Sequence, residues 1–155
     1  MKRSESLIEL SREHHFGLLL VWKIRQGQRL NVAPERIASY TEQMFSELLA
    51  QHFLEEERYV YSILPEDHPL RMQGLNEHDE LRSLINRIAL TAGGNNLGIF
   101  AHVLESHIRF EERELFSFLQ DYFPKELEAA HNLMPKHGPI TEPLWHDPFW
   151  EQKPL

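Results

Sequence analysis

The chain of 155 residues contains no cysteine. This absence excludes disulfide bonds, iron–sulfur clusters, thiolate zinc sites and cysteine nucleophiles. A metal ion bound here would therefore take nitrogen and oxygen ligands, for which ten histidines and 24 acidic residues are available. Glycine is also scarce, with seven residues, and 41% of the residues are hydrophobic. This composition favours a helical globular domain with a core of its own.

Basic residues and long apolar runs are scarce as well. Lys and Arg number 16 against 24 Asp and Glu, so the formal net charge is −8. Such a charge argues against binding to nucleic acid or to an anionic membrane. The longest apolar run, residues 18–22, is too short to span a bilayer, and the N-terminus lacks the apolar segment of a signal peptide. We therefore expect a cytoplasmic protein without nucleic-acid or membrane partners.

Hydrophobic periodicity predicts four amphipathic helices. Their expected ranges are 5–26 before Gly27, 34–64 before Pro65, 68–92 before Gly93, and 96–122 before Pro124. Asp67 is the expected N-cap of the third helix. Short connections between long helices favour an all-α fold, an up-down-up-down four-helix bundle. A short extra helix over about 125–131 would complete a domain that spans 1–131.

Residues 132–155 differ from the rest of the chain. They contain five prolines together with Trp145, Phe149 and Trp150, so this C-terminal tail is not a continuous helix. Two alternatives are left open for it. The aromatic residues either pack on the bundle or on a second subunit, or the tail is loosely ordered.

Two histidine–glutamate pairs share one spacing. His52 precedes Glu56 by four residues, and His107 precedes Glu111 by four. Residues four apart on a helix lie on one face, with Cβ atoms roughly 5–6 Å apart. One such pair is weak support for a metal site, because it is common as a surface ion pair. Here both pairs fall on apolar helix faces, and the apolar faces of the other two helices carry His14 and His78.

The centre of a bundle is where these groups would meet. A buried carboxylate is unfavourable unless it is paired or bound to metal. Two divalent ions would neutralise two buried glutamates, which could bridge the ions while histidines bind outside the bridge. Imidazole together with carboxylate suits iron, manganese or zinc.

The four segments that contain these residues resemble the hemerythrin-like (HHE cation-binding) domain family. They are LSREHHFGLLL, HFLEEERYVYSILP, NEHDELRSLI and HIRFEERELF, and the resemblance covers roughly residues 5–122. It implies a non-haem site of two iron ions with an oxo or hydroxo bridge. The implied metal ligands are His14, His52, Glu56, His78, His107 and Glu111, with Glu56 and Glu111 as bridges.

Two ligand positions have alternatives. His14 shares its face with leucines and is favoured over His15, whose face is more polar. The oxygen-carrying family members place a carboxylate five residues after the fourth-helix histidine, so Glu112 competes with Glu111. They also carry a second histidine four residues before the position of His78, where this chain has Gly74. One iron would therefore lack a protein ligand, and water, another side chain or substrate could fill its place. An open coordination position favours sensing or chemistry over simple oxygen carriage.

Other polar residues near the two pairs are interpreted more plainly. Tyr59, one turn after Glu56, is interpreted as a core tyrosine with its hydroxyl satisfied. Four further glutamates are interpreted as solvated or as hydrogen-bond partners of histidine N–H groups. They are Glu55, Glu57, Glu112 and Glu114.

The resemblance implies a metal-binding protein that senses or handles O₂, peroxide, nitric oxide or iron, with a small gaseous or peroxide ligand as its partner. The alternatives are a di-iron oxidase or peroxidase, and a mononuclear or zinc-binding structural bundle. A ferritin-type site is disfavoured, because Glu128-x-x-His131 is the sole Glu-x-x-His motif, and the H-E-x-x-H motif of metalloproteases is absent. The acidic surface and the aromatic tail leave room for a homodimer.

Overall fold

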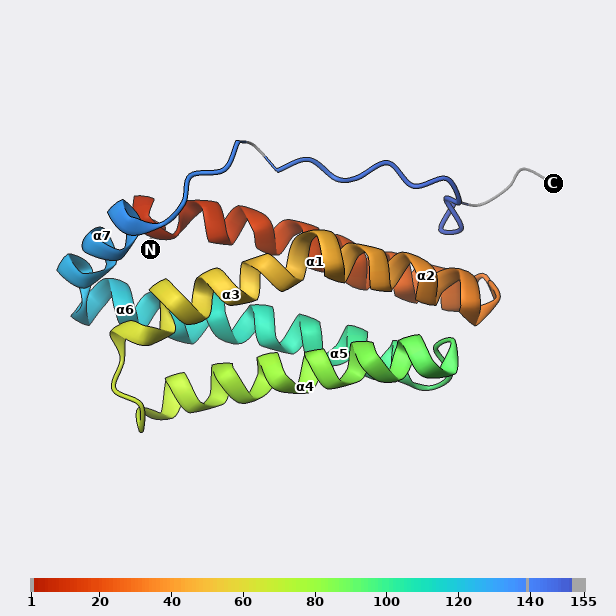
Figure 1. Ribbon diagram of the computed structural model, residues 1–155, viewed down its shortest axis with the longest axis horizontal. Coiled ribbons are helices and arrows are strands. Elements are labelled where there is room, and N and C mark those ends of the chain that lie inside the picture. Colours follow the sequence, from red (N-terminus) through yellow and green to blue (C-terminus); the bar gives the residue numbers. More distant parts are fainter. Residues whose placement is uncertain (1, 139, 152–155) are drawn as a thin grey trace.

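A computed structural model describes residues 2–138 and 140–151, and this part of the chain forms four antiparallel helical rods and one short helix (Figure 1). The first rod is α1 (Glu5–Arg29) and the third is α4 (Pro69–Thr91). The second joins α2 (Pro34–Met44), the π-helical turn η1 (Phe45–Leu49) and α3 (Ala50–Tyr59). The fourth joins α5 (Asn96–Phe110), the π-helical turn η3 (Glu111–Leu115) and α6 (Phe116–Tyr122). The short helix is α7 (Pro124–Leu133). This confirms the predicted all-α bundle with an extra C-terminal helix.

Local sequence explains where most rods begin and end. The Ser4 side chain caps α1 by accepting a hydrogen bond from the backbone N–H of Ser6 at 3.2 Å. Proline occupies the first turn of α2, α4 and α7, where its missing N–H is not needed. After α4 the backbone turns left-handed at Ala92, Gly93 and Gly94, a conformation that glycine adopts without strain.

Two predicted boundaries are wrong. Gly27 does not end α1, which continues to Arg29. A Cβ at Gly27 would lie 2.8 Å from both Ile37 and Phe149, so this glycine serves close packing inside the helix. The N-cap of α4 is His68 rather than Asp67, because the His68 ring accepts the Leu70 N–H at 3.1 Å.

The apolar core is divided in two along the rods. One cluster contains Leu20 and Ile24 of α1, and the other contains Leu7 and Leu10 of the same helix. His14 lies between them in the sequence of α1. Each fully buried leucine or phenylalanine contributes about 1.5–3 kcal/mol, so the two clusters supply the free energy that holds polar groups buried between them.

The second rod ends in a tight 3-10 turn, η2 (Tyr61–Ile63), which follows Val60 and leads to α4.

The tail returns from α7 along α1 and α2 (Figure 1). There the Lys23 ammonium donates to Tyr40 and to Glu142 of the tail, Arg36 pairs with Asp147, and Phe149 is 3% exposed. Among the described residues, no helix is both long enough and apolar enough to cross a membrane.

Candidate metal centre

Six ionisable side chains from all four rods meet between the two apolar clusters. Each is at most 4% exposed. They are His14 of α1, His52 and Glu56 of α3, His78 of α4, His107 of α5, and Glu111, the first residue of η3. These are the six residues for which metal ligation was predicted.

The six side chains form two overlapping groups of potential metal ligands. The His14/His52 group consists of His14, His52, Glu56 and Glu111, and the His78/His107 group of His78, His107 and the same two glutamates. Within each group the ligand atoms lie within 4.8 Å of one another. Two cations placed in these groups would therefore share both carboxylates.

The Nε2 atom of every histidine in the centre faces a shared glutamate. The distances are 2.9 Å from His14 to Glu111 Oε1, 3.2 Å from His52 to Glu56 Oε1, 3.2 Å from His78 to Glu56 Oε1, and 3.2 Å from His107 to Glu111 Oε2. Among the described residues, Nε2 of His52, His78 and His107 and both oxygens of Glu56 are buried without a hydrogen-bond partner. Buried polar atoms are nearly always satisfied, so five unsatisfied atoms that face one another mark a place for a cation.

The outer nitrogen of each histidine is held by a second carboxylate. The Nδ1 contacts are His14–Glu112 at 2.7 Å, His52–Glu13 at 2.8 Å, His78–Glu57 at 2.7 Å, and His107–Glu77 at 2.7 Å. With Nδ1–H donating outward, the Nε2 lone pair of a neutral imidazole points into the centre, the arrangement typical of metal-binding histidines. We call Glu13, Glu57, Glu77 and Glu112 the carboxylate ring.

The carboxylate ring links the rods in a closed circle. Each member is the chain neighbour of a centre residue on its own rod, and it holds the histidine of another rod. Glu13 of the first rod holds the histidine of the second rod, and Glu57 of the second rod holds that of the third. Glu77 of the third rod holds the histidine of the fourth, and Glu112 of the fourth rod holds that of the first. Of these four, sequence reasoning had marked Glu57 and Glu112 but missed Glu13 and Glu77. The available signal was that each precedes a core histidine directly.

The electrostatics of the centre favour positive charge on the imidazoles. Burial alone would lower the pKa of His52, but the charge of Glu56 and the hydrogen bond to Glu13 raise it to about 9. Burial alone would also lower the pKa of His78, but the nearby carboxylates of Glu111, Glu56 and Glu57 raise it to about 11. Burial and the charge of Glu111 would raise the pKa of Glu56, yet His52 and His14 lower it to about 2. Without a metal, protons on the histidines neutralise the glutamates, so metal binding must release protons.

The structure places the two members of each alternative pair differently. His14 is buried, whereas His15 is exposed. Glu111 and Glu112 both contact the His14 ring, Glu111 at Nε2 and Glu112 at Nδ1. Of Glu111 and Glu112, only Glu111 belongs to the two groups of potential ligands found among the described residues. The α-helical ladder widens to a π-turn at Glu111, and such turns are frequent at functional sites.

Tyr61, which sequence reasoning did not single out, also reaches the centre. Its side chain is fully buried, and its hydroxyl donates to Glu111 Oε2 at 2.5 Å. Burial and the negative charges of Glu111 and Glu56 raise the pKa of this phenol above its ordinary value. Tyr59, which was considered instead, is only half-buried. On a continuous helix Tyr59 would stack over Glu56, but α3 ends at Tyr59 and the following turn brings Tyr61 inward.

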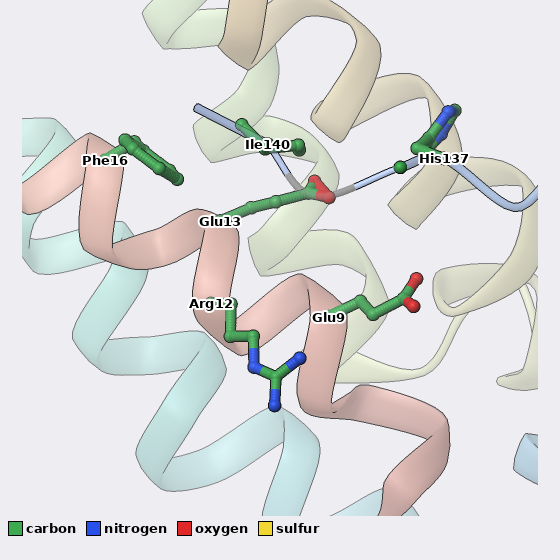
Figure 2. Close-up of a pocket in the computed structure, with 7 residues that line it drawn as sticks. Glu9, Arg12, Glu13, Phe16, His137 and Ile140 are labelled. Atoms are coloured by element: carbon green, nitrogen blue, oxygen red, sulfur yellow. The ribbon is translucent and has the colours of Figure 1, made fainter. Parts of the chain in front are cut away.

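A surface hollow lies beside the centre but does not contain it. It has a volume of about 280 Å³ and opens between α1 and the tail (Figure 2). Glu9, Arg12, Glu13 and Phe16 line one side, and His137 and Ile140 of the tail line the other. Glu13 is shared with the carboxylate ring, so the hollow reaches the outer contact of His52.

Fold and site together define a helical bundle whose candidate metal ligands come from every rod. The family model described as Hemerythrin HHE cation binding domain matches residues 6–119, about three quarters of the chain. The chain belongs to this family. Searches of curated proteins and of solved structures each return no significant match.

Proposed function

We propose that this chain binds two iron ions in its core and uses them to sense or handle O₂, peroxide, nitric oxide or iron itself. The observation that carries the proposal is the set of five buried, unsatisfied atoms that face one another in two groups with shared carboxylates. Four histidines and two glutamates form a nitrogen and oxygen donor set that suits iron. In this role Glu56 and Glu111 would be shared by the two ions, His14 and His52 would hold one ion, and His78 and His107 would hold the other.

The residues beside the His14/His52 group support a small ligand rather than a large substrate. A narrow gap, which we call the apolar slot, lies beside His14, His52 and His107 and is too small to hold a water molecule. Its apolar lining includes Gly17, Leu49, Leu104 and Ile108. A pair of iron ions supplies electron transfer to a diatomic or peroxide ligand. Since the apolar slot has no space for water, a diatomic or peroxide ligand could enter it only if its side chains moved, and the ligand would then meet no competing hydrogen-bond partners there.

The chemistry of the slot favours binding over turnover. Among the residues that line it, the sole ionisable groups are the histidines and Glu111 of the centre. A di-iron oxidase or peroxidase must also move protons to and from its substrate, and in the described lining no separate acid or base is placed for that. Measured turnover would therefore support the enzyme alternative, and zinc or manganese in the purified protein would support a site for one of those metals.

The test is metal loading followed by ligand titration. The protein is loaded with ferrous iron without air, desalted, and analysed for iron, zinc and manganese, and absorption spectra are then recorded with O₂, peroxide and nitric oxide. We expect two irons per chain, as the two groups require, and spectra that change at stoichiometric ligand. His14→Ala should lose iron, while His15→Ala, the exposed neighbour, should keep it. Equal iron in both variants would contradict the proposal.

A further inference from the structure

The Tyr61 hydroxyl lies among the atoms of the His78/His107 group. It donates to Glu111 Oε2, and that oxygen is also 3.2 Å from His107 Nε2 and 3.7 Å from His78 Nε2. The Tyr61 ring stands edge-on to the His78 ring at 5.5 Å between centroids. The phenol oxygen therefore shares a neighbourhood with two imidazole nitrogens and a carboxylate oxygen.

Gly74 of α4 makes this position available to Tyr61. It lies four residues before His78, so a side chain there would project from the same helix face toward the centre. A Cβ on Gly74 would lie 2.1 Å from Cε1 and from the hydroxyl oxygen of Tyr61 and 2.2 Å from Cζ. The phenol thus fills the volume that a side chain of residue 74 would otherwise occupy. From this face the α4 rod provides the His78 nitrogen, and the turn η2 brings the Tyr61 hydroxyl oxygen to the same place.

The His14/His52 group has different surroundings. On α1 a glycine, Gly17, lies three residues after His14, and a Cβ there would meet the Ile108 Cδ1 atom at 2.7 Å. An aliphatic side chain, which cannot ligate a metal, therefore fills the space beside Gly17. Within the described residues, the phenol beside Gly74 makes the His78/His107 group richer in oxygen donors than its counterpart.

We propose that Tyr61 is a seventh protein ligand of the centre and that its oxygen binds the ion held by His78 and His107. This inference rests on the proposed dinuclear site and deepens it. When the ion binds, the O–H bond breaks, the proton leaves to solvent and an O–metal bond forms without any change in oxidation state. A cation reverses the local field that acts on a neighbouring group, which is why metal binding and ligand deprotonation are linked. A phenolate is a hard anionic oxygen donor, so it favours ferric iron in this group.

Spectroscopy of the loaded protein tests the inference independently of activity. Ferrous iron is added without air, the protein is oxidised in air, and iron content is measured with the visible absorption and resonance Raman spectra. A phenolate bound to ferric iron gives a visible charge-transfer band that enhances tyrosine ring vibrations. We expect both signals in the wild type and their loss in Tyr61→Phe, with most of the iron retained through the six other ligands. Tyr59→Phe, two residues earlier and half-buried, should keep both signals.

A second variant guards against an indirect effect of Tyr61→Phe. Gly74→Ala leaves the phenol in the chain but fills its space, so we expect the band to weaken or vanish there too. Two bound irons with no tyrosine vibrations in the wild type, or a band that survives Tyr61→Phe, would overturn the ligand role and leave the dinuclear proposal standing. Failure of the wild type to bind iron would overturn both.

Discussion

The two groups of the centre share both of their carboxylates, yet they are surrounded by different chemistry. In both, a ring carboxylate holds Nδ1 of each histidine so that Nε2 faces inward. The apolar slot borders both histidines of the His14/His52 group but only His107 of the other group, whereas the Tyr61 ring, which is packed on Gly74, stands against His78. The same donor set is thus completed by a protein oxygen on one side and left beside an apolar gap on the other.

This difference shows how a nearly symmetric bundle can provide two unequal metal positions. Both sides depend on a glycine whose Cβ would meet the side chain packed against it, Ile108 at Gly17 and Tyr61 at Gly74. The identity of that packed side chain decides what the position offers.

The largest expected effect is the loss of a shared carboxylate. Glu111→Gln removes the negative charge that both groups use, so both ions should be lost, whereas His107→Ala should reduce the binding of one. In the metal-free protein we expect Glu111→Gln to lower the free energy of unfolding by about 3–5 kcal/mol, because it leaves buried imidazolium groups uncompensated. Urea unfolding and metal analysis measure the two effects. Glu114→Gln, exposed in the same turn, is the control; a similar loss there would contradict the assignment.

The next effect is a pH dependence that metal should reverse. The folded-state pKa of His52 is about 9 and that of His78 about 11, above the value of about 6.5 in an unfolded chain. The stabilisation from their protons is complete below about pH 6.5 and is lost as the pH rises through 9 and then 11. One pKa unit corresponds to about 1.4 kcal/mol, so His52 alone contributes on the order of 3 kcal/mol.

Thermal unfolding of the metal-free protein should therefore show a falling Tm between about pH 6.5 and 9. The metal-loaded protein should keep its Tm over this interval, since its Nε2 atoms carry no proton to lose. It should instead be destabilised in acid, where protons displace the metal. Parallel pH profiles of the two forms would contradict a shared site for protons and metal.

The two glycines offer a direct comparison of the two sides. Gly74→Ala forces Cβ against three atoms of the Tyr61 ring system, so we expect it to cost about 1–3 kcal/mol or more. Gly17→Ala meets the movable end of Ile108, and the helix preference for alanine over glycine, up to about 1 kcal/mol, offsets the crowding. Chemical denaturation should rank Gly74→Ala as the less stable variant. The reverse ranking would mean that the Tyr61 side is not the tightly filled one.

Variants of the carboxylate ring should produce the smallest losses and should distinguish the two ions. Glu77→Ala frees Nδ1 of His107, and Glu13→Ala frees Nδ1 of His52. Each variant should lower the binding affinity for one of the two ions by roughly 10–100-fold. Competition with a chelator measures this affinity. Glu80→Ala, exposed on the same helix as Glu77, should leave it unchanged.

Sequence periodicity was sufficient to predict the bundle and the six residues that meet in its core. A histidine or glutamate on an apolar helix face is an anomaly, and regular helical geometry then brings such residues together. The details that it missed lie where the backbone departs from the regular helix. The π-turn at Glu111 directs Glu111 and Glu112 to opposite nitrogens of His14, and the 3-10 turn exchanges Tyr59 for Tyr61.

Long-range packing was the other source of error. Gly27 has the identity of a helix terminator but contacts Phe149 of the tail, which is more than 100 residues away. Glu13 and Glu77 look like solvated residues next to core histidines, since their role depends on the histidine of another rod. The position of each glutamate directly before a core histidine was a local signal, but it does not reveal which histidine of another rod the glutamate holds.

Metal stoichiometry tests the central claim most directly. Wild type, Glu111→Gln and Glu114→Gln would be loaded with ferrous iron without air, desalted and analysed by plasma mass spectrometry against amino-acid analysis of the same samples. We expect two irons per chain in the wild type and in Glu114→Gln, one for each group, and almost none in Glu111→Gln. One iron or fewer in the wild type, or an undiminished content in Glu111→Gln, would contradict a pair of ions that share their carboxylates.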